Sequence, residues 1–192
     1  MRAGTVIADF ARGTDLGSYA PRVELGIRLH RRIDALVDAS PQVSSLKPLV
    51  QEPLRRYVGI LFDVFFDYAL IREWVHFHNV ERAAFCASIY ASLAQTEPAM
   101  PPVICAISAR MRQYDALSSC ATHEGCARTL GRIATRLKRP VDLAAGIVTL
   151  VEHEAAIVHA FSSLLSHLKQ QASSYLAGSS LNTRPLELSV ST

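Results

Sequence analysis

Several features that would assign this chain to a common class are missing from its 192 residues. Its four cysteines form no CxxC pair, which argues against a zinc ribbon and favours reduced thiols in a cytoplasmic protein. The most apolar stretch, Tyr57–Ile71, is too short to cross a bilayer and contains two aspartates. No apolar run of signal-peptide length occurs near Met1. We therefore expect neither a secreted disulfide protein nor a membrane protein.

Common catalytic motifs and strand patterns are also absent. The chain has no glycine-rich phosphate loop, no G-x-S-x-G elbow and no useful alternation of period two. The net charge of +3 is too small to imply nucleic acid by itself. A hydrophobic content of 49% indicates a folded protein of one-domain length. We predict a single compact all-α domain over residues 1–178 and a flexible C-terminal tail over residues 179–192.

About seven helices are expected from apolar residues at helical spacing and from proline breaks. Pro21 is a good first-turn residue, and Ser40-Pro41 should end the helix that starts there. The predicted helices are Thr5–Arg12, Pro21–Ala39, Pro53–His78, Glu81–Gln95, Val103–Ser119, Cys126–Pro140 and Val141–Gln171.

Two pairs of polar residues recur at a spacing of four on these helices. Asp63 and Asp67 share one face of an otherwise apolar helix, which we expect to be buried, and His30 and Asp34 share a face of another. A buried carboxylate is costly unless it is paired or binds a metal. Imidazole and carboxylate together suit Mn²⁺, Fe²⁺ or Mg²⁺. The alternatives are that the two aspartates pair with nearby arginines and that His30 is a satisfied core histidine.

A stripe of arginines on the helix near residue 130 is the other conspicuous feature. Arg128, Arg132 and Arg136 recur every four residues and have no evident acidic counterpart. A solvated helix face is the common outcome for such a run. The stripe also fits an anionic partner, such as an acidic protein, a phosphate or nucleic acid. The lack of aromatic residues within it argues against single-stranded nucleic acid.

Four segments in order along the chain resemble the acyl-carrier-protein phosphodiesterase family. They are ADFARG (8–13), LHRRIDALVD (29–38), RRYVGILFDVFFDYAL (55–70) and, more weakly, HEGCARTLGRIATRLKRP (123–140). The resemblance implies an all-helical, HD-like fold. It also implies an Mn²⁺-dependent hydrolase that removes 4′-phosphopantetheine from holo-acyl carrier protein, a reaction of fatty acid and lipid metabolism. Neither nucleic acid nor a membrane is an expected partner, and the oligomeric state stays open.

The resemblance carries over to particular positions. Asp9 matches the aspartate of the family's D-F segment, His30 and Asp34 match its H-R-x-I-D, and Asp63 and Asp67 match its D-x-x-x-D. It implies metal binding by His30, Asp34, Asp63 and Asp67, with Asp9 or Asp67 acting on the attacking water. Arg128, Arg132 and Arg136 would then dock the acidic carrier protein.

Two departures from the family pattern bear on activity. Family members usually begin with a segment like M-N-[FY]-L-A-H before the D-F element, whereas this sequence starts at Met1-Arg2-Ala3-Gly4. They also commonly have histidine where this chain has Tyr68. If either position serves the metal site, activity should be impaired. The alternatives are an HD-like phosphohydrolase of a nucleotide or small phosphodiester, and a carrier-protein-binding module with weakened catalysis. A nucleic-acid-binding regulator comes last.

Overall fold

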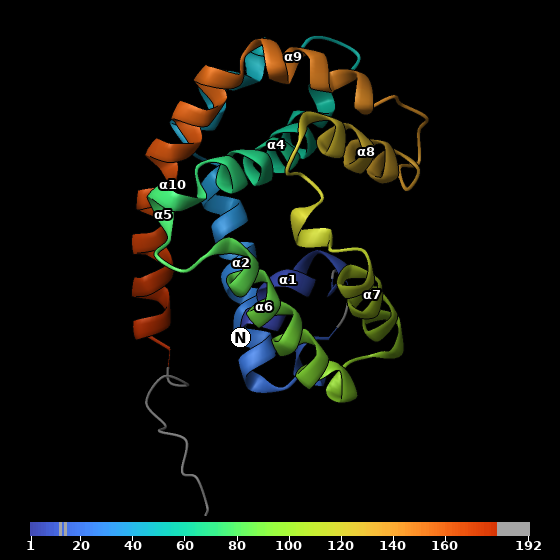
Figure 1. The fold of residues 1–192 in the computed structure, drawn as a ribbon, viewed down its shortest axis with the longest axis vertical. Coiled ribbons are helices and arrows are strands. Elements are labelled where there is room, and N and C mark those ends of the chain that lie inside the picture. The colour runs from blue at the N-terminus through green and yellow to red at the C-terminus, as the bar shows by residue number, and fades with distance from the viewer. Residues whose placement is uncertain (12, 14, 180–192) are drawn as a thin grey trace, which may run out of the picture.

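Helices account for all the regular structure in the part of the chain that is described, residues 1–11, 13 and 15–179 of a computed structural model (Figure 1). The all-α prediction is confirmed, although ten α-helices replace the expected seven or so. The HD-like likeness and the single-domain boundary stay predictions. The α-helices are α1 (Arg2–Ile7), α2 (Pro21–Asp38), α3 (Pro41–Leu46), α4 (Val58–Arg72), α5 (Trp74–Phe77), α6 (Arg82–Thr96), α7 (Pro102–Gln113), α8 (His123–Ala134), α9 (Ile147–Glu152) and α10 (Glu154–Ala177).

The starts of several helices follow from local sequence. Pro21, Pro41 and Pro102 occupy first-turn positions, where the missing N–H costs no hydrogen bond. The hydroxyl of Ser40 accepts a hydrogen bond from the backbone of α3 at 3.2 Å, and that of Thr122 caps α8 at 3.0 Å. The predicted break at Ser40-Pro41 is therefore confirmed.

The predicted helix Pro53–His78 is interrupted twice. A 3-10 turn at Arg55–Tyr57 precedes α4, and a break at Glu73 separates α4 from α5. The break turns Trp74 away from the axis of α4. Its ring then packs on Phe85 at a centroid distance of 4.9 Å, and its indole N–H donates to the carbonyl of Val80 at 2.8 Å. These contacts reach Val80 and Phe85, six and eleven residues further along, so the apolar pattern of a continuous helix did not reveal them.

The predicted helix Val141–Gln171 is divided in the same way. A 3-10 turn at Ala144–Gly146 leads into α9, and His153 separates α9 from α10 at a bend of 85°. The bend lets Leu150 and Ile157 enter the same core from two directions. In the described part of the chain no single helix could cross a membrane by length and apolarity, whereas this bent pair passes the same test when taken together.

Other boundaries differ by less. Residues 5–12 were expected to be helical, and α1 (Arg2–Ile7) is followed by a 3-10 turn at Ala8–Ala11. The helix predicted to reach Ser119 ends at Gln113, because Asp115 adopts a left-handed backbone with φ of 45°. The remaining 3-10 turns are Leu16–Ser18, Lys47–Leu49, Glu97–Ala99 and Ala116–Ser118. Except for Ser179, the tail predicted over residues 179–192 lies outside the described residues.

Two hydrophobic cores meet along α2, which runs through the middle of the molecule in Figure 1. The first half of α2 packs through Val23 and Ile27 into a core with α1, α6 and α7. Its second half packs through Ile33 and Val37 against a larger core built from α3, α4, α8, α9 and α10. His30 lies between these two apolar groups, so the fold places it where the cores adjoin.

Close contact between α1 and α2 fixes the segment that follows α1. A Cβ atom on Gly4 would overlap the carbonyl of Val23, and one on Gly26 would overlap that of Met1. Only glycine permits this approach of two backbones. The 3-10 turn Ala8–Ala11 consequently lies against α2, and with it Asp9 comes beside His30.

Candidate metal centre

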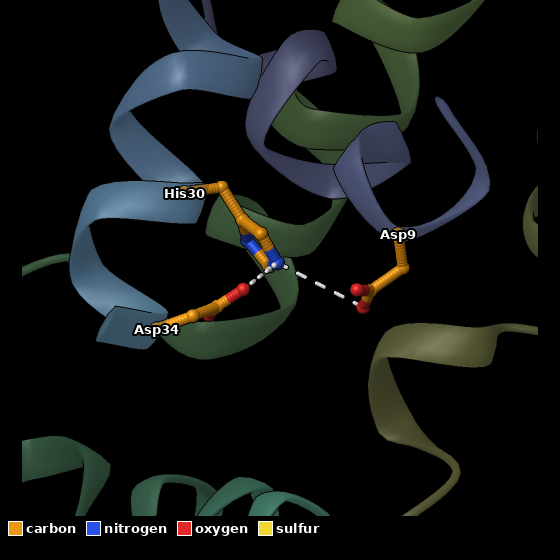
Figure 2. A group of neighbouring side chains, drawn as sticks. All are labelled: Asp9, His30 and Asp34. Carbon is orange, nitrogen blue, oxygen red and sulfur yellow. Dashed lines mark ion pairs between the residues drawn. The ribbon is translucent and has the colours of Figure 1, made fainter. Parts of the chain in front are cut away.

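Asp9, His30 and Asp34 form a triad of possible metal ligands. The Nε2 atom of His30 lies 3.3 Å from Oδ2 of Asp34 and 3.7 Å from Oδ2 of Asp9. One ligand atom from each residue lies within 4.8 Å of the others. Figure 2 shows the three side chains pointing toward one another, one from the 3-10 turn after α1 and two from adjacent turns of α2.

The triad is accessible to solvent and has more carboxylates than the one imidazole can balance. The side chain of His30 is 29% exposed, and those of Asp9 and Asp34 are 57% and 46% exposed. A hydrogen bond to Asp9 and the charges of Asp34, Asp9 and Asp63 raise the pKa of His30, against an opposing effect of burial. The surplus of carboxylates therefore favours a positive charge at this position, as a proton or as a cation.

Asp63 and Asp67 lie on the face of α4 that is turned toward this triad. We expected buried carboxylates, and this is wrong: both side chains are exposed, while the buried residues of α4 lie on its other faces. The two positions share one face at a spacing of four, and that face borders the triad instead of entering the core. Within the described residues neither aspartate forms an ion pair with an arginine, and Arg72 pairs instead with Glu154 and Glu73.

The two carboxylates titrate well above the usual range. Desolvation by the surrounding protein, with repulsion from Asp34, Asp38 and Asp9, raises the pKa of Asp63 to about 6 although water reaches its side chain. Desolvation and the charges of Cys120 and Asp63 raise that of Asp67 to about 7. We call the carboxylates of Asp9, Asp34, Asp63 and Asp67 around His30 the acidic seam.

The donor set suits a hard divalent cation. Two carboxylates and an imidazole converge, with no thiolate among them, and such ligands fit Mn²⁺, Fe²⁺ or Mg²⁺ better than Cu⁺. Asp63 and Asp67 lie near enough to feel the charge of His30, yet they do not belong to the group within 4.8 Å. The structure thus brings together Asp9, His30 and Asp34, and it holds the other two predicted ligands in an outer position.

The predicted arginine stripe is only partly helical. Arg128 and Arg132 lie exposed on α8, but α8 ends at Ala134, so Arg136 and the residues to Pro140 fall beyond the predicted helix. Arg128 has an acidic neighbour after all, since its Nη1 lies 3.6 Å from Glu124. Arg132 donates to the hydroxyl of Thr129 at 3.0 Å. The stripe is shorter and less uniformly basic than its spacing indicated.

A second polar cluster, which the sequence did not indicate, surrounds Glu154 at the start of α10. The hydroxyl of Tyr68 donates to Glu154 at 3.1 Å, Arg72 forms an ion pair with it, and Nε2 of His123 lies 2.8 Å from its other oxygen. We call these four residues the Glu154 cluster. It joins α4, α8 and α10, whose residues are far apart along the chain, so no spacing signal could have found it.

All four cysteines are free thiols, as expected. Cys120 and Cys126 are buried at the start of α8, and a hydrogen bond from Cys126 lowers the pKa of Cys120 to about 6. The charge of Cys120 adds to the acidic environment of Asp67. Cys120 therefore adds negative charge next to the acidic seam, and none of the four cysteines forms a disulfide.

The described part of the chain is all-helical and has a solvent-accessible carboxylate–imidazole triad, a donor set that could hold a metal ion. The acyl carrier protein phosphodiesterase family model matches residues 1–168. The chain belongs to the acyl carrier protein phosphodiesterase family.

Individual relatives agree with this assignment. An acyl carrier protein phosphodiesterase of Pectobacterium atrosepticum is 43% identical over 72 residues, which are 38% of this chain and 37% of the relative. Those of Serratia proteamaculans and Salmonella dublin are 35% and 36% identical over about half of each chain. The chain thus spans about half the length, or less, of these curated relatives. No solved structure matches.

Proposed function

We propose that this protein is a metal-dependent phosphodiesterase that releases 4′-phosphopantetheine from holo-acyl carrier protein. The observation that carries the proposal is the Asp9–His30–Asp34 triad in a chain of the acyl carrier protein phosphodiesterase family. The three residues fall on the segments that first suggested the family, ADFARG and LHRRIDALVD. Family membership and local geometry therefore support the same site.

Asp9, His30 and Asp34 would hold the cation, which we propose to be Mn²⁺. Such an ion polarises a phosphoryl oxygen and lowers the pKa of water at the site. His30 must give up its proton to act as a ligand, and the adjoining carboxylates keep the site negative when it does so. Asp63 would act from α4, either as a further ligand or by orienting water.

Asp67 is suited to accept the proton of the attacking water. A general base works best when its pKa lies near the working pH, and that of Asp67 is raised to about 7. The water oxygen would attack phosphorus, and the bond from phosphorus to the serine oxygen of the carrier would break. That serine oxygen takes up a proton, which leaves apo-carrier protein and 4′-phosphopantetheine.

Tyr68, which stands where the family commonly has histidine, makes its contacts outside the triad. Its hydroxyl donates to Glu154 and its ring packs on His123 at 4.7 Å, so this side chain belongs to the Glu154 cluster. Asp9, His30 and Asp34 meet without it. Tyrosine at position 68 is therefore compatible with an active triad. Arg128, Arg132 and Arg136 remain our proposal for a surface that attracts the acidic carrier.

Mass spectrometry of holo-acyl carrier protein incubated with the purified chain and Mn²⁺ tests the proposal. We expect the carrier to lose the mass of phosphopantetheine, and an Asp34→Asn variant to leave it intact. The isosteric change removes one anionic ligand without creating a cavity. An Asp63→Ala variant then reports whether the outer carboxylate is also required.

Two other outcomes would replace this function. Turnover of a small synthetic phosphodiester, with holo-carrier protein untouched, would identify an HD-like phosphohydrolase of small substrates. Tight binding of holo-carrier protein with no release of phosphopantetheine, even with Mn²⁺ present, would identify a carrier-binding module without catalysis. Each result is read from the same reaction mixture, so the three functions are separated by one set of measurements.

A further inference from the structure

The arginine of the H-R-x-I-D segment, Arg31, has no part in the site described so far. It directly follows His30 on α2, but successive side chains on a helix lie about 100° apart, so it leaves the helix in a different direction. Its Nη2 atom donates a hydrogen bond to the backbone carbonyl of Ala11 at 3.1 Å. Ala11 is the last residue of the 3-10 turn that carries Asp9. Arg31 therefore connects α2 to the segment that supplies the third member of the triad.

The neighbouring arginines of α2 make contacts of other kinds. Arg28 pairs with Glu24 on the same helix at 2.7 Å. The guanidinium carbon of Arg32 lies 5.6 Å from the centroid of the Tyr175 ring on α10. Arg32 is exposed and carries the same charge as Arg31, but its contact is with a different element. It is therefore a matched control for any effect of Arg31.

The turn that carries Asp9 needs support at its end. A 3-10 turn of four residues has little stability of its own, and the last carbonyl groups of any helix lack a partner within it. Ala11 is fully buried, so its carbonyl has little access to water. A basic side chain can take this place at the end of a helix. The close glycine contact between α1 and α2 holds the beginning of this segment, and Arg31 holds its end.

Asp9 depends on this support more than Asp34 does. His30 and Asp34 project from adjacent turns of α2, so the helix itself fixes their separation of 3.3 Å. Figure 2 shows Asp9 reaching the same imidazole from a separate turn, at 3.7 Å. Ligand distances in a metal site are defined to about 0.2 Å. A small displacement of the turn would consequently remove Asp9 from the ligand set and leave the other two ligands in place.

We infer that Arg31 is a positioning residue that holds Asp9 in place for the cation, an inference that rests on the metal centre of the proposed function. It acts through the backbone of Ala11 and touches neither the metal nor the substrate. Its charge and its hydrogen bond have opposite consequences for a bound cation. A positive charge near the site repels the cation, whereas a fixed Asp9 attracts it. Removal of Arg31 therefore weakens cation binding only if the hydrogen bond is the larger effect.

Calorimetric titration of the full chain with Mn²⁺ is the first test. Arg31→Met keeps an apolar stem and removes the charge and the donors. We expect it to bind Mn²⁺ about tenfold more weakly, the lower end of the range for residues that orient metal ligands. Arg32→Met should bind within about twofold of the parent or slightly tighter, and Arg31→Lys, which keeps a donor, should bind within about threefold. Partial unfolding would lower the number of sites and not their affinity.

A second mutation shows whether the effect passes through Asp9. In an Asp9→Asn background the position of the turn no longer controls an anionic ligand. Adding Arg31→Met should then change Mn²⁺ affinity by less than about twofold, although it changes affinity about tenfold in the parent. Such a failure of additivity is the signature of two residues that act together. Additive losses would show that Arg31 acts by another route and would overturn the inference.

Amide hydrogen exchange in EDTA tests the anchor without any metal. We expect the amides of Ala8–Ala11 to exchange at least about tenfold faster in Arg31→Met than in the parent, because the turn opens more often. The amides of α2 should be unaffected, and Arg32→Met should match the parent throughout. Equal exchange of the turn in Arg31→Met and the parent would show that the hydrogen bond does not hold it.

The results separate this inference from the proposed function. If the parent cleaves holo-carrier protein and Arg31→Met binds Mn²⁺ as tightly as the parent or more tightly, Arg31 is not a positioning residue and the proposed function stands. If the parent binds Mn²⁺ and Arg31→Met binds it about tenfold more weakly, but neither cleaves the carrier, the positioning role stands and the proposed reaction fails. A parent that binds no Mn²⁺ would overturn both.

Discussion

The triad and the Glu154 cluster each place a histidine against carboxylate, but they balance charge in opposite ways. His30 faces Asp9 and Asp34, with Asp63 and Asp67 close behind, so one imidazole meets a surplus of negative charge. In the Glu154 cluster one carboxylate accepts a hydrogen bond from Tyr68, pairs with Arg72 and lies beside the imidazole of His123. The first arrangement could accommodate a further cation, whereas in the second an arginine of the protein itself pairs with the carboxylate.

Their positions in the fold differ correspondingly. The triad lies where the two hydrophobic cores adjoin along α2, on elements that leave it accessible to solvent. The Glu154 cluster lies at the edge of the larger core and ties together α4, α8 and the start of α10. A carboxylate at a helix N-terminus is also favoured by the helix dipole. A histidine–carboxylate contact is thus a candidate functional site only when its surroundings leave charge uncompensated.

Removing a triad ligand should have the largest effect. We expect His30→Ala and Asp34→Asn to lower kcat/KM for holo-carrier protein by more than about 100-fold, beyond the 10–100-fold typical of residues that only orient metal ligands. Isothermal titration should show the loss of Mn²⁺ binding in parallel. His167→Ala, which removes an exposed histidine from α10, is the control and should keep full activity. Equal activity of His30→Ala and the parent would contradict the triad as a metal site.

Mn²⁺ should stabilise the protein in a pH-dependent manner. Raised pKa values of about 6 for Asp63 and about 7 for Asp67 mean that the folded protein binds extra protons between pH 4 and 7. The free energy of unfolding of the metal-free protein therefore falls as pH rises through this window. His30 acts in the same direction, because its raised pKa contributes stability below about 6.5 that is lost as pH rises through the folded value.

A cation would relieve the repulsion that remains at high pH. At a Mn²⁺ concentration of 100 times Kd, binding should add about 2.7 kcal/mol to the stability. We expect the increase in Tm on adding Mn²⁺ to be large at pH 8 and small at pH 5.5, as measured by calorimetry against EDTA. The Asp63→Asn/Asp67→Asn variant should flatten the pH dependence of the metal-free protein. A Tm shift independent of pH would show that these carboxylates do not titrate with the site.

Local sequence predicted the triad's two helical members and not its third. His30 and Asp34 are one turn apart, so helical spacing alone places them together. Asp9 joins them only because Gly4 and Gly26 allow α1 to lie tightly on α2, a contact that spacing cannot express. Spacing also could not show which elements Asp63 and Asp67 face. The apolar residues around them predicted burial, but which face of α4 borders the triad is set by tertiary packing.

Helix boundaries failed for a related reason. The sequence of α4 and α5 reads as one continuous apolar helix, and so do α9 and α10. The break at Glu73 goes with the packing of Trp74 on Phe85, and the break at His153 lets Leu150 and Ile157 enter the same core; neither contact is visible in the apolar pattern. Helix boundaries that local residues fix, such as those at Pro21 and Ser40, were predicted correctly. The Glu154 cluster joins residues far apart along the chain, so the local sequence could not predict it.

Neutralising Glu154 should destabilise the protein and spare metal binding. Glu154→Gln keeps the shape of the side chain but removes the charge that Arg72 and His123 share. Because Arg72 is about half exposed, we expect a loss of about 1–2 kcal/mol in urea unfolding. Glu152→Gln, at an exposed position two residues earlier, should change stability by less than about 0.5 kcal/mol. A loss of Mn²⁺ affinity in Glu154→Gln would show that the triad and the Glu154 cluster act as one site.

Tyr68→Phe should have the smallest effect. It is also the most direct test that the triad and the Glu154 cluster are separate. It removes one hydroxyl that donates to Glu154 and keeps the ring that packs on Phe65 and His123. We expect a loss of about 0.5–1.5 kcal/mol in stability, with Mn²⁺ affinity and kcat within about twofold of the parent. Tyr68 directly follows Asp67, so a disturbed backbone would show first in the pH dependence of kcat. If that profile shifts while stability is unchanged, position 68 acts on the acidic seam and not through Glu154.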